Sequence, residues 1–299
     1  MRILLLGSSG QLGKELGRQL SNVGSVAAFP RSSLNITDYS AVKDAVRCVH
    51  PDIIVNAAAY TAVDQAENDV QTAFAINAEA VANLAQLAKA EHSWLFNYST
   101  DYVFDGTKPT PYIETDIPNP INVYGASKLA GEQAIAEANC QHIIFRTTWV
   151  IGKDGSNFAK TILRLATERQ ELNVISDQIG VPTSPALLSK VTIDAIQSIK
   201  NDRAWSQGIY HLTPLGVSNW HEIAQTLLSF AELRHVSLNA HAADIKAIAT
   251  EEYPTAAQRP LNSQLDTRKL RAQLSFDLPH WKEDFLAVAS EILKELQTA

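Results

Sequence analysis

The stretch RILLLGSSGQLG, residues 2–13, decides the fold of this chain. A short apolar run leads directly into three glycines, Gly7, Gly10 and Gly13, and a helical pattern follows them. A strand, a glycine-rich turn and a helix in this order are typical of dinucleotide-binding domains, because a pyrophosphate can approach the helix N-terminus through the turn. Close packing of the helix on the strand would also explain the glycines. Because a strand precedes them, we favour the dinucleotide site.

The alternation of β-type runs with helical patterns continues as far as about residue 150. We expect strands at 2–6, 25–29, 52–56, 93–98 and 142–146, and helices at 10–22, 38–49, 70–91 and 122–138. Strands that alternate with helices predict βαβ units. The fold class is therefore α/β, with a doubly wound parallel sheet of the Rossmann type.

Beyond residue 150 the alternation is looser. Helices are expected at 157–168, 184–199, 218–231 and 280–297, with strands at 171–175 and 208–212. The length of 299 residues allows one large domain or two unequal ones. Four of the chain's 12 prolines fall between residues 109 and 120, which predicts an ordered loop. Such a loop either covers a ligand or serves as a surface spacer.

The composition excludes several classes of protein. The formal charge of −7, without a basic block, argues against nucleic acid as a partner. No apolar run approaches the ~18–20 residues of a membrane-spanning helix, and the apolar run 3–6 is too short for a signal peptide. Cys48 and Cys140 stand alone and are typical of reduced thiols. We therefore expect a cytoplasmic protein that binds neither nucleic acid nor membrane.

The end of the second strand indicates which dinucleotide binds. A carboxylate there would hold the ribose 2′-hydroxyl of NAD and repel the 2′-phosphate of NADP. Here Pro30 and Arg31 follow Phe29, and no acidic residue occurs before Asp38. Because a guanidinium binds phosphate well, the sequence favours NADPH, with use of NADH left open.

Tyr124 and Lys128 form the candidate catalytic pair. Their spacing of four places them on one face of a helix, where a positive charge favours the phenolate and helps tyrosine exchange a proton. Tyr39 and Lys43 have the same spacing, so spacing alone proves little. Position separates the two pairs, because Tyr124 follows the fourth strand and Tyr39 lies near the predicted adenosine end. Thr100, at the end of the fourth strand, would donate a hydrogen bond to the reacting carbonyl.

Further strings extend the motif set over nearly the whole chain. Together with the glycine motif they resemble the extended short-chain dehydrogenase/reductase superfamily and, within it, the dTDP-4-dehydrorhamnose reductase family. The strings are NAAAYTAVD (56–64), STDYVF (99–104), YGASKLAGE (124–132), RTTWV (146–150), DQIGVPT (177–183) and YPTAAQRP (253–260).

The resemblance implies a two-part fold and a reaction. Residues 1–150 would form the dinucleotide-binding domain, to which the chain returns around 176–212, and 151–299 would mainly form a smaller α/β domain for a nucleotide sugar. The reaction would be reduction of the C4 keto group of dTDP-4-dehydro-β-L-rhamnose, the last step of dTDP-L-rhamnose biosynthesis. Tyr124 would donate the proton, Lys128 would hold the nicotinamide ribose and lower the pKa of Tyr124, and Thr100 would hydrogen-bond the reacting oxygen.

The remaining site predictions combine the motifs with the resemblance. The residues expected to bind the cofactor are Gly7, Gly10, Gln11, Leu12, Gly13, Arg31, Asn35, Ile36, Ala59, Tyr60, Thr61, Tyr98, Tyr124 and Lys128. The residues expected to bind the substrate are Val63, Thr100, Asp101, Tyr102, Trp149 and Arg259.

Some members of the resembled family bind Mg²⁺ through three acidic positions. Glu15 and Glu291 match the outer two, but the middle one is Ala186, so we expect no metal, and a monomer or a homodimer that does not depend on one. Two alternatives remain open: a reductase of another dTDP-4-keto-6-deoxysugar, and a regulatory subunit that binds cofactor without turnover. Regulatory relatives commonly lose the catalytic tyrosine or lysine, whereas both are present here.

Overall fold

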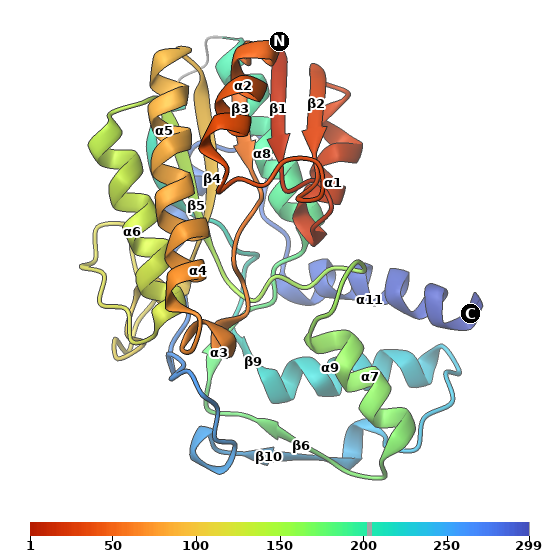
Figure 1. Ribbon diagram of the computed structural model, residues 1–299. Helices are drawn as coiled ribbons and strands as arrows, with labels where there is room; N and C mark the ends of the chain where they lie inside the picture. The colour runs from red at the N-terminus through yellow and green to blue at the C-terminus, as the bar shows by residue number, and fades with distance from the viewer. Residues whose placement is uncertain (202–204, 299) are drawn as a thin grey trace.

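The computed structural model describes residues 1–201 and 205–298. Residues 202–204, inside the predicted return segment 176–212, and residue 299 lie outside the described part. Figure 1 shows a parallel sheet between two helical layers, with a second group of helices and short strands beyond the carboxyl ends of the sheet strands. We call these the sheet lobe and the second lobe.

The central sheet has six strands in the order β2-β1-β3-β4-β5-β8, and all neighbours are parallel. The strands are β1 Arg2–Leu6, β2 Ser25–Phe29, β3 Ile53–Asn56, β4 Trp94–Thr100, β5 His142–Thr147 and β8 Gly208–His211. The predicted doubly wound fold is thereby confirmed. Because β2 and β3 lie on opposite sides of β1, the strand order reverses there, which is where doubly wound sheets bind ligands.

Helices cover both faces of the sheet and fill the second lobe. They are α1 Gln11–Leu20, α2 Tyr39–Val49, α3 Val63–Ala66, α4 Val70–Phe74, α5 Ala80–Ala90, α6 Val123–Ala138, α7 Phe158–Glu168, α8 Pro185–Lys200, α9 Trp220–Leu233, α10 Arg268–Arg271 and α11 Trp281–Thr298. Three short 3₁₀ turns lie at Asp101–Val103, Ala242–Asp244 and Thr250–Glu252. Within the described residues, no helix is both long enough and apolar enough to span a membrane.

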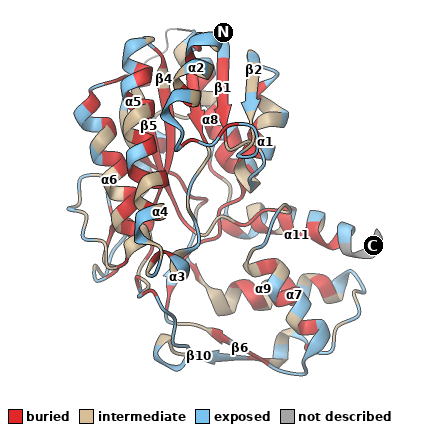
Figure 2. Ribbon diagram, viewed as in Figure 1, coloured by how far each residue is buried: buried red, intermediate tan, exposed pale blue. Residues whose placement is uncertain are grey.

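The run RILLL explains why β1 lies at the centre. Ile3 and Leu5 belong to the core under α1 and α8, whereas Leu4 and Leu6 belong to the core under α2, α5 and α6. Successive side chains of a strand point to opposite faces, so only a strand covered on both sides buries every residue of such a run. Figure 2 shows the resulting buried strand between its two helical layers.

The predicted helix 70–91 exists, but a π-helical turn, Ala75–Glu79, separates α4 from α5. Asn77 lies in this turn and accepts a hydrogen bond from Tyr60 N at 2.9 Å, while its amide donates to Ser127 Oγ at 3.0 Å. The turn therefore ties the loop after β3 to α6. A π-helical turn has no periodicity signal of its own in the sequence, and such turns are frequent near functional sites.

The second lobe has its own apolar core, formed by α7, α9 and α11. Short strand pairs border it: β6 Leu172–Ile175 with β10 Ile245–Ile248, and β7 Ile179–Gly180 with β9 Ser218–Asn219. The sequence predicts β6 but not the other three, which are too short for an alternation pattern. Between these segments the chain returns to the sheet lobe, where α8 packs on α1 and β8 extends the sheet.

Candidate active site

A cleft of about 610 Å³ lies at the carboxyl ends of the sheet strands, between the two lobes. The N-terminus of α1, the loops after β3 and β4, the end of β5 and helix α6 form one wall, and residues 156–158 with Trp220 form the other. Most of the predicted site residues meet here: Gly10, Gln11, Leu12, Ala59, Thr61, Val63, Tyr98, Thr100, Asp101, Tyr102, Tyr124, Lys128, Trp149 and Arg259.

The three glycines of the first turn have different roles. Gly7 has a φ of +73°, and a Cβ there would lie 2.6 Å from Ala58 N; a Cβ on Gly13 would lie 2.0 Å from Gly7 O. These two glycines are needed for packing, and neither lines the cleft. A Cβ on Gly10 would meet only Gly7 O, at 3.5 Å. Packing does not require Gly10, and its open face leaves the N-terminus of α1 accessible to a pyrophosphate.

The residues predicted at the adenosine end lie outside the cleft. Arg31 and Asn35 line a separate hollow of about 270 Å³, together with Gln71 and Thr72. The Arg31 side chain is exposed and forms no hydrogen bond or ion pair with any residue that the structure describes, so its guanidinium is available to an anion. Ile36 is buried in the core of the sheet lobe, so its side chain does not reach either hollow.

Two predicted cofactor contacts hold loops together. The Gln11 side-chain oxygen accepts hydrogen bonds from Gly152 N at 3.0 Å and from Asn157 Nδ2 at 3.2 Å, which joins the glycine turn to the loop before α7. Tyr60 does not line the cleft, and its hydroxyl donates to Asp69 at 3.2 Å. Gln11 lines the cleft as predicted. In the loop after β3, Ala59 and Thr61 line the cleft and Tyr60 between them does not.

Tyr124 lies in the first turn of α6. Asn122 caps this helix by accepting a hydrogen bond from Gly125 N at 2.8 Å, and the cap fixes where the helix begins. Burial raises the pKa of Tyr124 to about 12, and a hydrogen bond with Thr100 opposes the rise. Lys128 has no resolved effect on this pKa in the protein without ligands, so the expectation that Lys128 lowers it stays a prediction. Tyr124 is thus a neutral phenol, as a proton donor must be.

Lys128 follows one helical turn later and is 4% exposed. Burial lowers its pKa to about 8, and the charge of Glu132 opposes this. Within residues 1–201 and 205–298 its ammonium has no hydrogen-bond or ion-pair partner. Because buried ammonium groups are normally paired, its donors remain available for a ligand in the cleft.

Two further polar atoms on the cleft wall, Ser99 Oγ and Thr147 Oγ1, are buried without a hydrogen-bond partner among the described residues. Buried polar atoms are almost always hydrogen-bonded, so these two atoms are open to a ligand that enters the cleft. Thr100 Oγ1 donates to Asp101 Oδ1 at 3.0 Å, and burial raises the pKa of Asp101 to about 7. Part of the Asp101 population is therefore uncharged at neutral pH and does not repel an anionic ligand.

An aromatic wall closes the side of the cleft that faces the second lobe. Trp149 stacks on Trp220 with ring centroids 3.9 Å apart, and Phe158 lies 4.6 Å from Trp220. Trp149 has a φ of +39°, and its ring fits closely against Gly180, where a Cβ would lie 2.8 Å from Trp149 Cζ2. The sequence predicts Trp149 only, since Trp220 and Phe158 come from second-lobe helices without a motif.

Arg259 reaches the cleft from the segment that follows β10. Its Nη1 and Nη2 donate to the two carboxylate oxygens of Asp64, at 3.0 and 2.6 Å. Asp64 lies in α3, so this ion pair fastens the segment to the sheet lobe. An anion that binds Arg259 has to compete with Asp64.

The three positions compared with a family metal site lie in one hollow of about 30 Å³. Glu15 pairs with Arg18 at 2.5 Å, Glu291 pairs with Lys153 at 3.7 Å, and Ala186 lies between them. Each carboxylate thus already faces a cation. In the described part of the chain, no group of three or more histidine, cysteine, aspartate or glutamate side chains is arranged to hold a metal.

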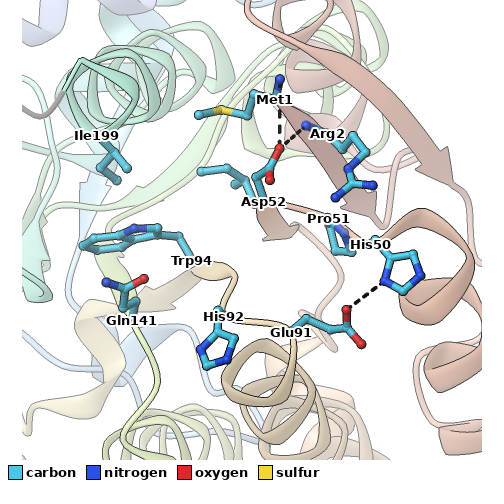
Figure 3. Close-up of a pocket in the computed structure, with 11 residues that line it drawn as sticks. Met1, Arg2, His50, Pro51, Asp52, Glu91, His92, Trp94, Gln141 and Ile199 are labelled. Carbon is cyan, nitrogen blue, oxygen red and sulfur yellow. Dashed lines mark hydrogen bonds and ion pairs between the residues drawn. The ribbon is translucent and has the colours of Figure 1, made fainter.

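A further hollow, of about 460 Å³, lies at the opposite end of the sheet strands (Figure 3). Its polar groups include two pairs: His50 Nδ1 with Glu91 Oε2 at 3.0 Å, and the terminal amine of Met1 with Asp52 at 4.0 Å. It contains none of the predicted site residues and none of the unpartnered buried atoms. The cleft between the lobes is therefore the candidate active site.

The comparisons with known proteins agree with the family resemblance of the sequence motifs. The family described as "RmlD substrate binding domain" matches residues 1–294. A dTDP-4-dehydrorhamnose reductase of Escherichia coli is 44% identical over 299 residues, 98% of each chain. The solved dTDP-4-dehydrorhamnose reductase of Bacillus anthracis in complex with NADP is 37% identical, with a TM-score of 0.87 over 97% of this chain and 99% of that one. A UDP-glucose 4-epimerase of Thermus thermophilus, 17% identical, shares only the fold, with a TM-score of 0.79 over 98% and 99% of the chains.

Proposed function

The chain belongs to the family described as the RmlD substrate binding domain, and from this premise we propose that Tyr124, Lys128 and Thr100 carry its chemistry. The reaction is the NADPH-dependent reduction of the C4 keto group of dTDP-4-dehydro-β-L-rhamnose to dTDP-β-L-rhamnose. The observation that carries the residue roles is the convergence of the Thr100, Tyr124 and Lys128 side chains on the wall of the cleft, where the buried Lys128 ammonium has no partner among the described residues.

NADPH, when bound, supplies the hydride that the C4 carbon receives. The keto oxygen then needs a proton, and Tyr124 holds one because burial raises its pKa to about 12. Thr100 hydrogen-bonds the same oxygen when its hydroxyl turns to it from Asp101, and this bond stabilises the charge that develops on the oxygen. Lys128 offers its unpaired ammonium to the nicotinamide ribose, and its charge stabilises the phenolate after the proton has left.

Two features of the chain would hold the cofactor. The open face of Gly10 exposes the N-terminus of α1 to the pyrophosphate. Arg31 offers a free guanidinium in the hollow beyond β2, where a 2′-phosphate would bind. We propose that Arg31 accounts for the preference for NADPH over NADH.

We also propose that the two lobes bind different ligands. Residues 1–150, with the return segment around 176–212, bind the cofactor, and the rest of 151–299 binds the nucleotide sugar. The proposal is supported by the cleft walls, because the glycine turn lies on the sheet lobe and Phe158 and Trp220 lie on the second lobe. Val63, Asp101, Tyr102, Trp149 and Arg259 would bind the substrate.

The protein would act in the cytoplasm, as a monomer or as a homodimer that needs no metal. The absence of a metal requirement is supported by the cation that faces each of Glu15 and Glu291.

The direct test of the reaction is NADPH consumption by purified protein, with identification of the product. We expect NADPH to be oxidised when dTDP-4-dehydro-β-L-rhamnose is added, and not when it is omitted. dTDP-4-keto-6-deoxy-D-glucose serves as the control for another sugar. Faster turnover of this control would assign the chain to a different 4-keto sugar, and cofactor binding without turnover of either sugar would indicate a regulatory subunit.

A further inference from the structure

A buried ion pair lies one helical turn beyond Lys128. Glu132 follows Lys128 by four residues on α6, so the two side chains share one face of the helix. Arg146, on β5, donates to Glu132 through Nε at 2.9 Å and through Nη2 at 2.5 Å. Glu132 is 3% exposed and Arg146 is 2% exposed. The carboxylate is thus held in one place by a two-pronged contact.

Stability alone does not explain this pair. Burying two charges costs about as much as their attraction returns, and apolar or neutral side chains of similar size are often as stable. Arg146 Nη1 is also left without a hydrogen-bond partner in the described structure, although its guanidinium packs on the Phe104 ring at 5.1 Å. Because stability does not explain the buried Glu132–Arg146 pair, we look for a neighbouring group that requires the Glu132 charge.

Lys128 is the group that needs a negative charge nearby, because the proposed reaction requires its ammonium to be positively charged while it is buried and unpaired. Burial lowers its pKa, and Glu132 is the one charged group in the described structure that opposes this to a resolved extent. The other ionisable residues on elements packed against α6 are Asp64, Glu79, Lys89, Tyr98, Asp101, Tyr102 and Arg146, and on α6 itself Tyr124 and Glu137. None of them contributes a resolved effect on Lys128.

We propose that Glu132 is a positioning residue of the reductase: it keeps the Lys128 ammonium charged, and Arg146 holds the Glu132 carboxylate in place for this purpose. The inference rests on the proposed function, in which a charged Lys128 is needed for turnover. It extends the catalytic apparatus from the cleft wall to a pair of residues that do not line the cleft.

The test is the pH dependence of kcat in wild type and in Glu132→Gln, with NADPH and dTDP-4-dehydro-β-L-rhamnose. Activity falls at alkaline pH when Lys128 loses its proton. Without the Glu132 charge the fall is expected at a pH lower by about 1 unit, since loss of a nearby opposite charge shifts a pKa by on the order of one unit. A KM for NADPH that rises at the same pH would accompany it.

Arg146→Lys is the matched control. It keeps both charges but loses the two-pronged contact, so it is expected to lower the melting temperature and to leave the alkaline fall of kcat at its wild-type pH. The double variant Glu132→Gln/Arg146→Met removes both charges of the pair together, so it is expected to fold even where Glu132→Gln, which leaves Arg146 without its partner, does not. It is also expected to show a shift to lower pH, because Glu132 and not Arg146 has the resolved effect on Lys128.

The outcomes separate the two claims. A wild-type pH profile in Glu132→Gln, or in the double variant, would overturn the role of Glu132 while leaving the reaction intact. An equal shift in Arg146→Lys would also overturn it, because packing rather than charge would then be the cause. A wild-type protein without activity on the keto sugar would instead contradict the proposed function.

Discussion

Replacing Asp101 by Asn should change the pH dependence of stability. The free energy of unfolding of Asp101→Asn, measured relative to wild type, should be higher at alkaline pH than at acidic pH. Burial raises the pKa of Asp101 from 3.8 to about 7 in the folded protein. The folded state therefore holds this proton more tightly than the unfolded state. The stability that the protonated carboxyl contributes is complete below pH 3.8 and is lost as the pH rises through about 7.

The magnitude follows from the two pKa values. About three pH units separate them, and each unit corresponds to 1.36 kcal/mol, so the whole effect is about 4 kcal/mol. Between pH 5 and pH 8 the wild-type protein loses the part of this stability that corresponds to about two of the three pH units. Asn cannot ionise, so over this range the free energy of unfolding of Asp101→Asn should rise by about 3 kcal/mol relative to wild type.

Urea unfolding of both proteins without ligands, at several values between pH 5 and pH 8, measures this difference. Asp105→Asn is the matched control, because hydrogen bonds from Thr107 and Asn119 hold the pKa of Asp105 far below its usual range. Its difference from wild type should stay constant over the same interval. If the Asp101→Asn difference is also constant, Asp101 titrates as in water, and burial does not raise its pKa in the folded protein.

Further variants test the cofactor site and the metal. Arg31→Ala should raise the KM for NADPH about tenfold and leave the KM for NADH within about twofold, since one charge-assisted contact is lost; equal effects on both cofactors would contradict the role of Arg31. Gly7→Ala should lower the melting temperature by several degrees because of its positive φ and close packing, whereas Gly10→Ala should fold normally and bind NADPH weakly. Equal stability losses in both would show that Gly10 serves packing. Dialysis against EDTA should change neither kcat nor the mass measured by light scattering, and a loss of either would reveal a metal.

The sheet lobe could be predicted closely from the sequence, because its signals are local. The run 2–6 and the run 25–29 coincide with β1 and β2. The continuous apolar pattern of a central parallel strand and the glycines that follow it leave few other arrangements. The π-helical turn around Asn77 was missed because it arises from contacts with Tyr60 and Ser127, which are distant in sequence.

The cleft could be predicted on one side only. Thr100, Tyr124 and Lys128 belong to motifs next to strand ends, so their meeting place follows from the topology of a parallel sheet. Trp220 and Phe158 lie at the starts of second-lobe helices, and only packing of the two lobes brings them to Trp149. The pKa of Tyr124 could not be inferred either, because it depends on burial, which spacing does not reveal.

The proline loop shows the same limit. The expectation that it covers a ligand finds no support, because none of the described residues 105–121 lines the cleft. Tyr112 from this loop stacks on Phe104 at 4.2 Å and pairs with Leu265, so the loop joins segments that are far apart in the sequence. Of the two sequence-based interpretations of this loop, the surface spacer therefore fits the structure better than the ligand cover.

The most direct test of the central claim compares wild type with Tyr124→Phe in the same assay, NADPH oxidation with dTDP-4-dehydro-β-L-rhamnose. Phe keeps the ring and its edge contact with Tyr102, whose centroid lies 5.8 Å away, but it cannot donate a proton. We expect kcat to fall by about 100-fold or more while the Kd for NADPH, measured by fluorescence titration, stays within about twofold. Turnover at the wild-type rate by the Phe variant would contradict the assignment of Tyr124 as the proton donor.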